Sequence, residues 1–123
     1  MPTAAMTAMI SVQALGAGLG GYSLLLWFRK ARKPAIIAFH VLAGLAGTET
    51  LMANIHMSDL PAESPVRALG LAAAICFAVA VLSGLIAALV GKDQRQLANW
   101  LLGLHVVSAL AGFLLALSFA GLF

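Results

Sequence analysis

Histidine is scarce in this chain of 123 residues, and two of its three histidines stand in matching surroundings. His40 lies in the segment FHVLAGLAG (39–47) and His105 in the segment LHVVSALAG (104–112), which share the histidine and the V, L, A and G at four further positions. Imidazole is a common metal ligand and an axial ligand of haem iron. The repetition therefore indicates two equivalent histidines that act as a pair.

A stripe of small residues follows each histidine at the i+3, i+4 and i+7 positions, which share one face of a helix. The stripes are Ala43, Gly44 and Gly47 after His40, and Ser108, Ala109 and Gly112 after His105. Small side chains beside an inward-facing imidazole leave room for a flat, bulky group. We therefore predict a cofactor site formed by His40, His105, Gly44, Gly47, Ala109 and Gly112.

Bis-histidine ligation of a b-type haem by His40 and His105 is the chemistry that this pattern favours, because helix bundles build cofactor sites from facing side chains. Two alternatives stay open. In the first, each imidazole simply hydrogen-bonds across the bundle. In the second, each imidazole separately ligates the magnesium of a (bacterio)chlorophyll, which needs one histidine per pigment.

The elements that carry these residues must lie in a membrane. The chain is 63% hydrophobic and 9% charged, with a mean hydropathy of +1.04, whereas about a quarter of the residues of a soluble domain are charged. A membrane-spanning helix needs about 20 apolar residues. Four such stretches fill the chain, so we predict a single all-α domain over 1–123, a transmembrane four-helix bundle with helices at 5–28, 34–57, 66–90 and 97–123.

Charge predicts the orientation of the bundle. Six basic residues lie in the loops after the first and third helices, and Arg67 alone lies in the loop between the second and third. The positive-inside rule places both termini on the non-cytoplasmic side. No basic segment precedes the first apolar stretch, which distinguishes it from a signal peptide. We expect a multi-pass protein of the bacterial inner membrane, and we attribute the basic pI to topology rather than to nucleic-acid binding.

Short connections make sequential helices antiparallel neighbours, so the bundle is predicted to consist of two tandem helical hairpins. The second and fourth helices then run in the same direction and lie diagonally across the bundle, as in other membrane proteins with parallel repeats. At about 1.5 Å per residue, His40 and His105 would both lie roughly 10 Å inside the membrane and face each other.

With these histidine segments and the four-helix plan, the chain resembles the small four-helix b-type membrane cytochromes, including the bacterial cytochrome b561-like class. The resemblance implies haem ligation by bundle histidines and electron transfer between quinol and other carriers. Only His40 and His105 match that pattern. The second histidine pair of the dihaem members is missing, which puts electron transfer across the whole membrane in doubt.

Two further ionisable residues lie on the second helix. His56 comes sixteen residues after His40, roughly 160° around the helix, and we interpret it as an interfacial residue, with a role as metal or pigment ligand as the alternative. Glu49 is predicted to face away from the core, where a carboxylate in lipid is costly. It would be protonated or hydrogen-bonded near Gln13, contact another subunit, or serve as a proton or quinone site.

The first helix carries Gly16 and Gly20, a small-xxx-small pair. Such pairs allow close helix packing, and close approach to a pigment or a partner subunit is the alternative.

Three functions follow from these residues. The first is a haem-bearing electron-transfer or anchor subunit, the second an accessory subunit of a larger photosynthetic or respiratory complex, and the third a small proton-coupled transporter that uses Glu49. No nucleophile–base pair, phosphate-binding glycine loop or CxxC motif is present, so we expect catalysis only as a subunit of an oxidoreductase complex. The expected partners are the lipid bilayer, other membrane subunits or further copies of the chain, and quinone.

Overall fold

Four long helices make up the computed structural model, which describes residues 3–123. They are α1 (Ala4–Phe28), α2 (Pro34–Met57), α3 (Pro65–Val90) and α4 (Arg95–Phe119). Each contains an 18-residue window with a mean hydropathy between 1.4 and 2.7, and at most 22% of any window is buried inside the protein. Each helix is thus long and apolar enough to cross a membrane, and its exposed surface suits lipid. The predicted all-α four-helix fold is confirmed.

Local sequence explains where the helices begin and end. The Thr3 hydroxyl accepts a hydrogen bond from the backbone N–H of Met6 at the start of α1, and α2 and α3 each begin with a proline, which suits a first helical turn. The predicted end of the fourth helix at residue 123 is wrong. α4 stops at Phe119 because Gly121 adopts a positive φ of 74°, a helix-ending conformation that glycine adopts readily.

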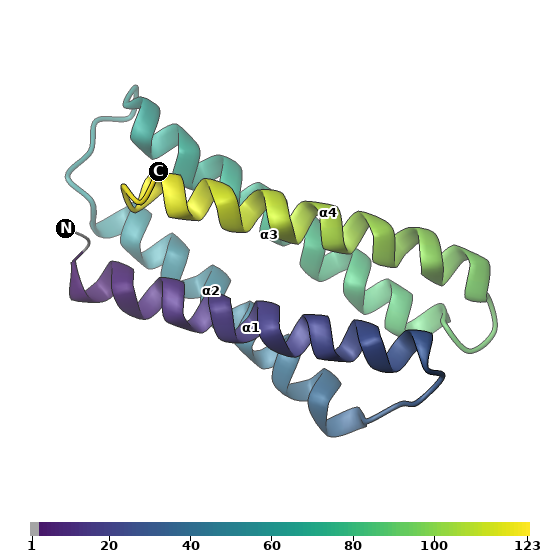
Figure 1. Cartoon of the computed structure of the whole chain (residues 1–123). Coiled ribbons are helices and arrows are strands. Elements are labelled where there is room, and N and C mark those ends of the chain that lie inside the picture. Colours follow the sequence, from purple (N-terminus) through teal and green to yellow (C-terminus); the bar gives the residue numbers. More distant parts are fainter. Residues whose placement is uncertain (1–2) are drawn as a thin grey trace.

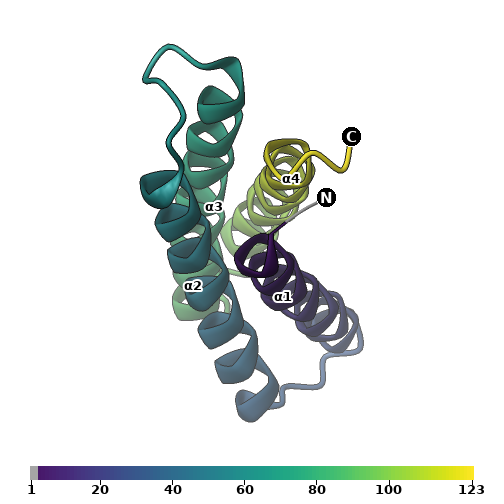
Figure 2. The same cartoon turned by 90° about the vertical axis from the view of Figure 1, so that its left-hand side faces the viewer.

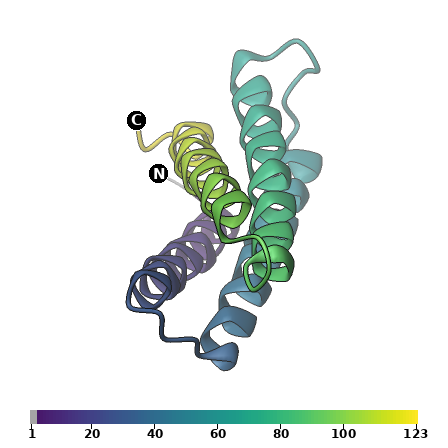
Figure 3. The same ribbon diagram turned by 90° about the vertical axis from the view of Figure 1, so that its right-hand side faces the viewer.

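The helices form two antiparallel hairpins, α1–α2 and α3–α4 (Figure 1). Contacts between the hairpins are mostly those of α2 with α3, whereas α1 and α4 touch sparsely. Viewed toward either end, α2 and α3 lie on one side of the bundle and α1 and α4 on the other (Figures 2 and 3). α2 and α4 are therefore diagonal, the arrangement expected from the tandem hairpins.

The packed core fills the end of the bundle where both termini lie (Figure 1). Its buried side chains are those of Met9, Leu51, Ile55, Ala73, Ala116, Phe119 and Ala120. A Cβ atom added at Gly70 would lie 2.9 Å from Cγ1 of Ile55, so this glycine lets α3 approach α2 closely. The two hairpins are thus held together firmly at this end.

A second set of contacts joins the hairpins at the opposite end. The Trp27 indole N–H donates to Oδ1 of Asn99 at 3.0 Å, and the guanidinium of Arg95 lies 4.3 Å from the centre of the Trp27 ring. The Arg32 guanidinium donates to the backbone carbonyl of Ala88 at 3.0 Å. Between this end and the packed core, the bundle contains a cavity.

Candidate functional site

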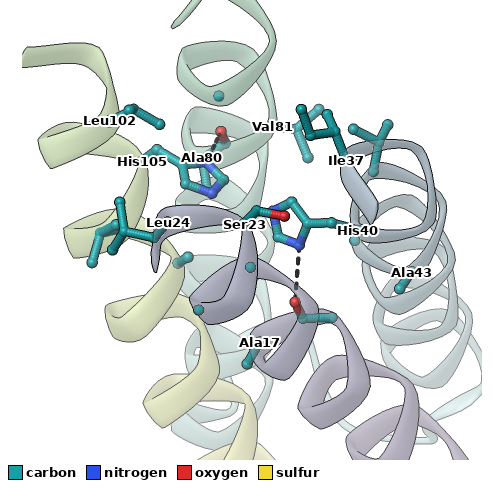
Figure 4. Close-up of a pocket in the computed structure, with 18 of the residues that line it drawn as sticks. Ala17, Ser23, Leu24, Ile37, His40, Ala43, Ala80, Val81, Leu102 and His105 are labelled. Atoms are coloured by element: carbon teal, nitrogen blue, oxygen red, sulfur yellow. Dashed lines mark hydrogen bonds between the residues drawn. The ribbon is translucent and has the colours of Figure 1, made fainter. Parts of the chain in front are cut away.

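A cavity of about 370 Å³ lies between the two hairpins, and all four helices contribute to its lining. Both His40 and His105 line it, and their rings lie beside each other (Figure 4). The ring centroids are 5.6 Å apart and the ring planes are nearly perpendicular, at 84°. The structure thus brings together the two histidines that the sequence repeat pairs.

Each imidazole is anchored in the same way to the other helix of its own hairpin. Nδ1 of His40 lies 2.9 Å from the carbonyl oxygen of Gly16, and Nδ1 of His105 lies 2.6 Å from the carbonyl oxygen of Ala80. The two carbonyls precede their histidines by 24 and 25 residues. The internal repeat therefore extends beyond the histidine segments into α1 and α3.

These hydrogen bonds determine the tautomer of both rings. A carbonyl oxygen can only accept, so Nδ1 must carry the proton and donate it. The neutral imidazole then has a free lone pair on Nε2, and no hydrogen bond to either Nε2 is found within residues 3–123. Metal-ligating histidines in proteins are typically held in this manner, with the second ring nitrogen donating to a backbone carbonyl or carboxylate.

Two glycines make room for the anchored rings. A Cβ atom at Gly20 would lie 2.7 Å from Cε1 of His40, and one at Gly84 would lie 2.6 Å from Nδ1 of His105. Each glycine follows its carbonyl residue, Gly16 or Ala80, by one helical turn. Any larger residue at Gly20 or Gly84 would displace the imidazole from its carbonyl. The Gly16–Gly20 pair thus serves both helix packing and the position of His40.

The donor set suits a cofactor that supplies most of its own metal ligands. Within the described residues, no group of three or more His, Cys, Asp or Glu side chains gathers to hold a metal ion. A haem needs only two axial ligands from the protein, and His40 and His105 provide two equivalent imidazoles.

The small residues predicted for the site divide into two groups. Gly44, Gly47 and Ala109 line the cavity, and a Cβ atom at Gly44 would meet nothing within 4 Å. Gly112 lies outside the lining, because a Cβ atom there would be 3.2 Å from Cys76 and Phe77 of α3. Gly112 therefore serves the packing of α4 on α3.

Glu49 and His56 are both exposed on the outer surface of α2 and do not line the cavity. For Glu49 this agrees with the predicted outward orientation. Gln13 does not contact it through a hydrogen bond, since the Gln13 amide donates instead to the carbonyl of Gly47 at 3.3 Å.

Sequence reasoning missed two buried oxygen atoms that also belong to the cavity lining. Oε1 of Gln13 and Oγ of Ser23 are buried and have no hydrogen-bond partner among the described residues. An unsatisfied buried polar group costs about 1–3 kcal/mol, so these atoms are places where a ligand or water would be stabilised. A weak signal was present, since Gln13 is a rare polar residue in an apolar helix.

Sequence reasoning also missed Gly84, although Ala80 and Gly84 repeat the small-xxx-small spacing of Gly16 and Gly20.

Comparison with models of protein families, with curated proteins and with solved structures finds no match to this chain.

Proposed function

We propose that this protein binds a b-type haem through His40 and His105 and acts as an electron-transfer or anchor subunit in a membrane. One observation carries the proposal. Two imidazoles from diagonal helices meet in a cavity, each fixed by an Nδ1 hydrogen bond that leaves Nε2 free. The alternative that each imidazole only hydrogen-bonds across the bundle also accounts for the bonds to Gly16 and Ala80; what favours a ligand is that both rings keep Nε2 free and line one cavity.

The spacing of the rings supports this proposal. Metal–imidazole bonds of about 2 Å separate two coordinating nitrogens by about 4 Å and the ring centroids by about 6 Å. The observed centroid separation of 5.6 Å is close to that value. A macrocycle must also part the hairpins, since 370 Å³ lies at the small end of the range for ligand cavities, about 300–1,000 Å³. On the side of α1 and α4, this widening breaks the Trp27–Asn99 and Arg95–Trp27 contacts.

A bound haem would supply one-electron redox chemistry. The chain itself holds the two imidazoles in position through hydrogen bonds from Nδ1–H to backbone carbonyls, and it surrounds the site with apolar side chains. Such hydrogen bonds raise the basicity of a ligating imidazole, and a dry surrounding favours the less charged oxidation state. The residues around His40 and His105 would therefore set the reduction potential.

The exposed carboxylate of Glu49 supports association with another membrane subunit. Glu49 lies in the middle of α2 on the lipid-facing surface, where an unpaired charge costs a few kcal/mol. A polar contact with a neighbouring subunit would remove that cost. We propose a bacterial inner membrane as the location, and an orientation with the 29–33 and 91–94 loops in the cytoplasm, because six basic residues lie at that end.

Visible absorption of protein purified from a haem-replete host tests the proposal. We expect a Soret band and α and β bands that sharpen on reduction. His40→Ala and His105→Ala should each abolish this six-coordinate spectrum. His56→Ala is the matched control, because the third histidine is exposed and distant from the cavity, and it should leave the spectrum unchanged.

Protein that is folded and colourless, in the presence of excess haem, would overturn the proposal. Red or near-infrared bands in place of a Soret–α–β pattern would instead indicate (bacterio)chlorophyll at the same histidines.

A further inference from the structure

One end of the cavity is basic, whereas the rest of its lining is apolar. The basic residues at this end are Arg32 and Lys33 in the α1–α2 loop, and Ser23 of α1 lines the cavity nearer to His40 (Figure 4). Around the histidines, the lining consists mainly of Ala, Gly, Val, Leu and Phe side chains. A ligand that matches this cavity is therefore apolar over most of its surface and anionic at one edge.

The turn after α1 directs the basic residues back over the cavity. The N–H of Ala31 donates to the carbonyl of Leu26 at 2.9 Å, and the N–H of Lys30 donates to the carbonyl of Trp27 at 3.1 Å. Lys30 has a positive φ of 54°. This is the Schellman pattern of helix termination. It reverses the chain tightly, so that the next two residues reach the cavity instead of extending into the cytoplasm.

Both cations are bound to neutral groups only. Arg32 donates to the carbonyl of Ala88 at 3.0 Å, and Nζ of Lys33 donates to the Tyr22 hydroxyl at 3.2 Å. A guanidinium has five N–H donors, so most of those of Arg32 stay available to an anion. The Arg32–Ala88 contact links the α1–α2 loop to α3, and both residues line the cavity.

Ser23 adds an independent observation. Its Oγ is buried, lines the cavity and has no hydrogen-bond partner among residues 3–123. The residue points into the same space as His40 (Figure 4). A hydroxyl can donate to a carboxylate, which would satisfy this atom. Ser23, Arg32 and Lys33 thus all line the same cavity.

We propose that Arg32, Lys33 and Ser23 form an anion subsite that binds the carboxylates of the ligand held by His40 and His105. The inference rests on the proposed function, under which these carboxylates are the two propionates on one edge of haem b. Arginine suits this role because its planar guanidinium pairs with a carboxylate through two parallel hydrogen bonds. The subsite fixes which edge of the macrocycle faces the cytoplasm.

The phosphate of an anionic lipid is a second source of the same chemistry. Basic residues at the cytoplasmic end of a bundle attract anionic headgroups, so the test must separate a lipid phosphate from a ligand carboxylate. Haem dimethyl ester does so, because it keeps the metal and the macrocycle and lacks both carboxylate charges.

The experiment measures the affinity of the apoprotein for haem and for haem dimethyl ester by absorption titration in nanodiscs of a zwitterionic lipid. Arg32→Gln and Lys33→Gln are compared with Arg29→Gln, which removes the same charge from the same loop at a residue outside the cavity lining. Arg32→Lys keeps the positive charge and removes the guanidinium, so it separates the effect of the charge from that of the guanidinium geometry. Thermal unfolding of each apoprotein reports any general loss of the fold.

For haem, we expect Arg32→Gln and Lys33→Gln each to lower the affinity about 10- to 100-fold, as for the loss of a hydrogen bond to a charged group. Arg32→Lys should lose part of the affinity, because lysine keeps the charge but cannot pair with a carboxylate through two parallel hydrogen bonds, and Arg29→Gln should retain all of it. The dimethyl ester should bind the wild-type chain more weakly than haem, and its affinity should not change in any variant.

Equal loss of affinity for haem and its ester in Arg32→Gln would show a structural role for Arg32 and overturn the inference. So would an effect that appears only when anionic lipid is added, which would assign the subsite to lipid phosphate. In both cases the bis-histidine spectrum would persist, so the proposed function would stand. Absence of that spectrum in the wild-type chain would overturn both.

Discussion

Adding a single methyl group at Gly20 or Gly84 should disturb the histidine site far more than its size suggests. In Gly84→Ala, the new Cβ atom would lie 2.6 Å from Nδ1 of His105, and in Gly20→Ala it would lie 2.7 Å from Cε1 of His40. Ordinary contacts begin at about 3.4–3.5 Å, so each ring must retreat by about 0.7–0.9 Å.

A retreat of this size weakens or breaks the anchor of each ring. The Nδ1 to carbonyl distances of 2.6 Å for His105 and 2.9 Å for His40 would approach or exceed the limit of a useful hydrogen bond, about 3.5 Å. Loss of such an outer hydrogen bond typically lowers metal affinity 10- to 100-fold. We expect this loss in both variants, with the larger effect in Gly84→Ala, because its methyl group meets the bonded nitrogen itself.

Haem titration followed by absorption provides the assay, with thermal unfolding of the apoprotein measured in parallel. Gly18→Ala and Gly103→Ala are matched controls, since a Cβ atom at either position meets nothing within 4 Å. Both controls should bind haem as the wild type does. Wild-type affinity in Gly20→Ala and Gly84→Ala, or an equal loss in the controls, would refute the reasoning.

Three further predictions concern the rest of the fold. Lys30→Gly should stabilise the protein by about 1 kcal/mol, because glycine relieves the positive φ of 54° at Lys30, and an unchanged or lower midpoint of denaturant unfolding would contradict this. Gly70→Ala should destabilise the protein by about 1–3 kcal/mol, because the added methyl group overpacks against Ile55 and Phe119, and it should leave the absorption spectrum unchanged. A wild-type unfolding midpoint in this variant would show that the end of the bundle near the termini is less tightly packed. Glu49→Leu should weaken association with another subunit, as measured by native mass spectrometry, and should leave the absorption spectrum unchanged. Unaltered association would show that Glu49 is not part of a subunit interface.

The number, length and order of the helices could be predicted from the sequence because hydropathy dominates in a membrane. Four apolar stretches long enough to span a bilayer, with Pro34 at the start of the second, leave few other arrangements. The end of α4 was mispredicted because hydropathy continues to Phe123, whereas the helix is ended by the backbone of Gly121.

The histidine pair could also be predicted, because a repeat that includes a rare residue is informative. The hydrogen-bond partners of the two histidines could not be predicted from the sequence. The anchors of His40 and His105 are backbone carbonyls, which any residue could offer, and their position depends on how far each helix slides along its neighbour. Only the folded hairpin determines that register.

Glycine content gave little guidance, since the chain has 12 glycines and their surroundings differ. Gly20 and Gly84 face imidazoles, Gly112 faces Phe77, and Gly18 faces open space. The spacing of small residues predicts a helix face, but only the three-dimensional structure distinguishes a face that packs on a helix from one that borders a cavity.

The claim that His40 and His105 together ligate one haem is tested most directly by electron paramagnetic resonance of the ferric, haem-loaded protein. The account predicts a low-spin signal in the wild type and in His56→Ala, and its conversion to a high-spin signal, or its loss with the haem, in His40→Ala and in His105→Ala. A low-spin signal that survives either substitution, or a wild-type protein that is high-spin or takes up no haem, would contradict it.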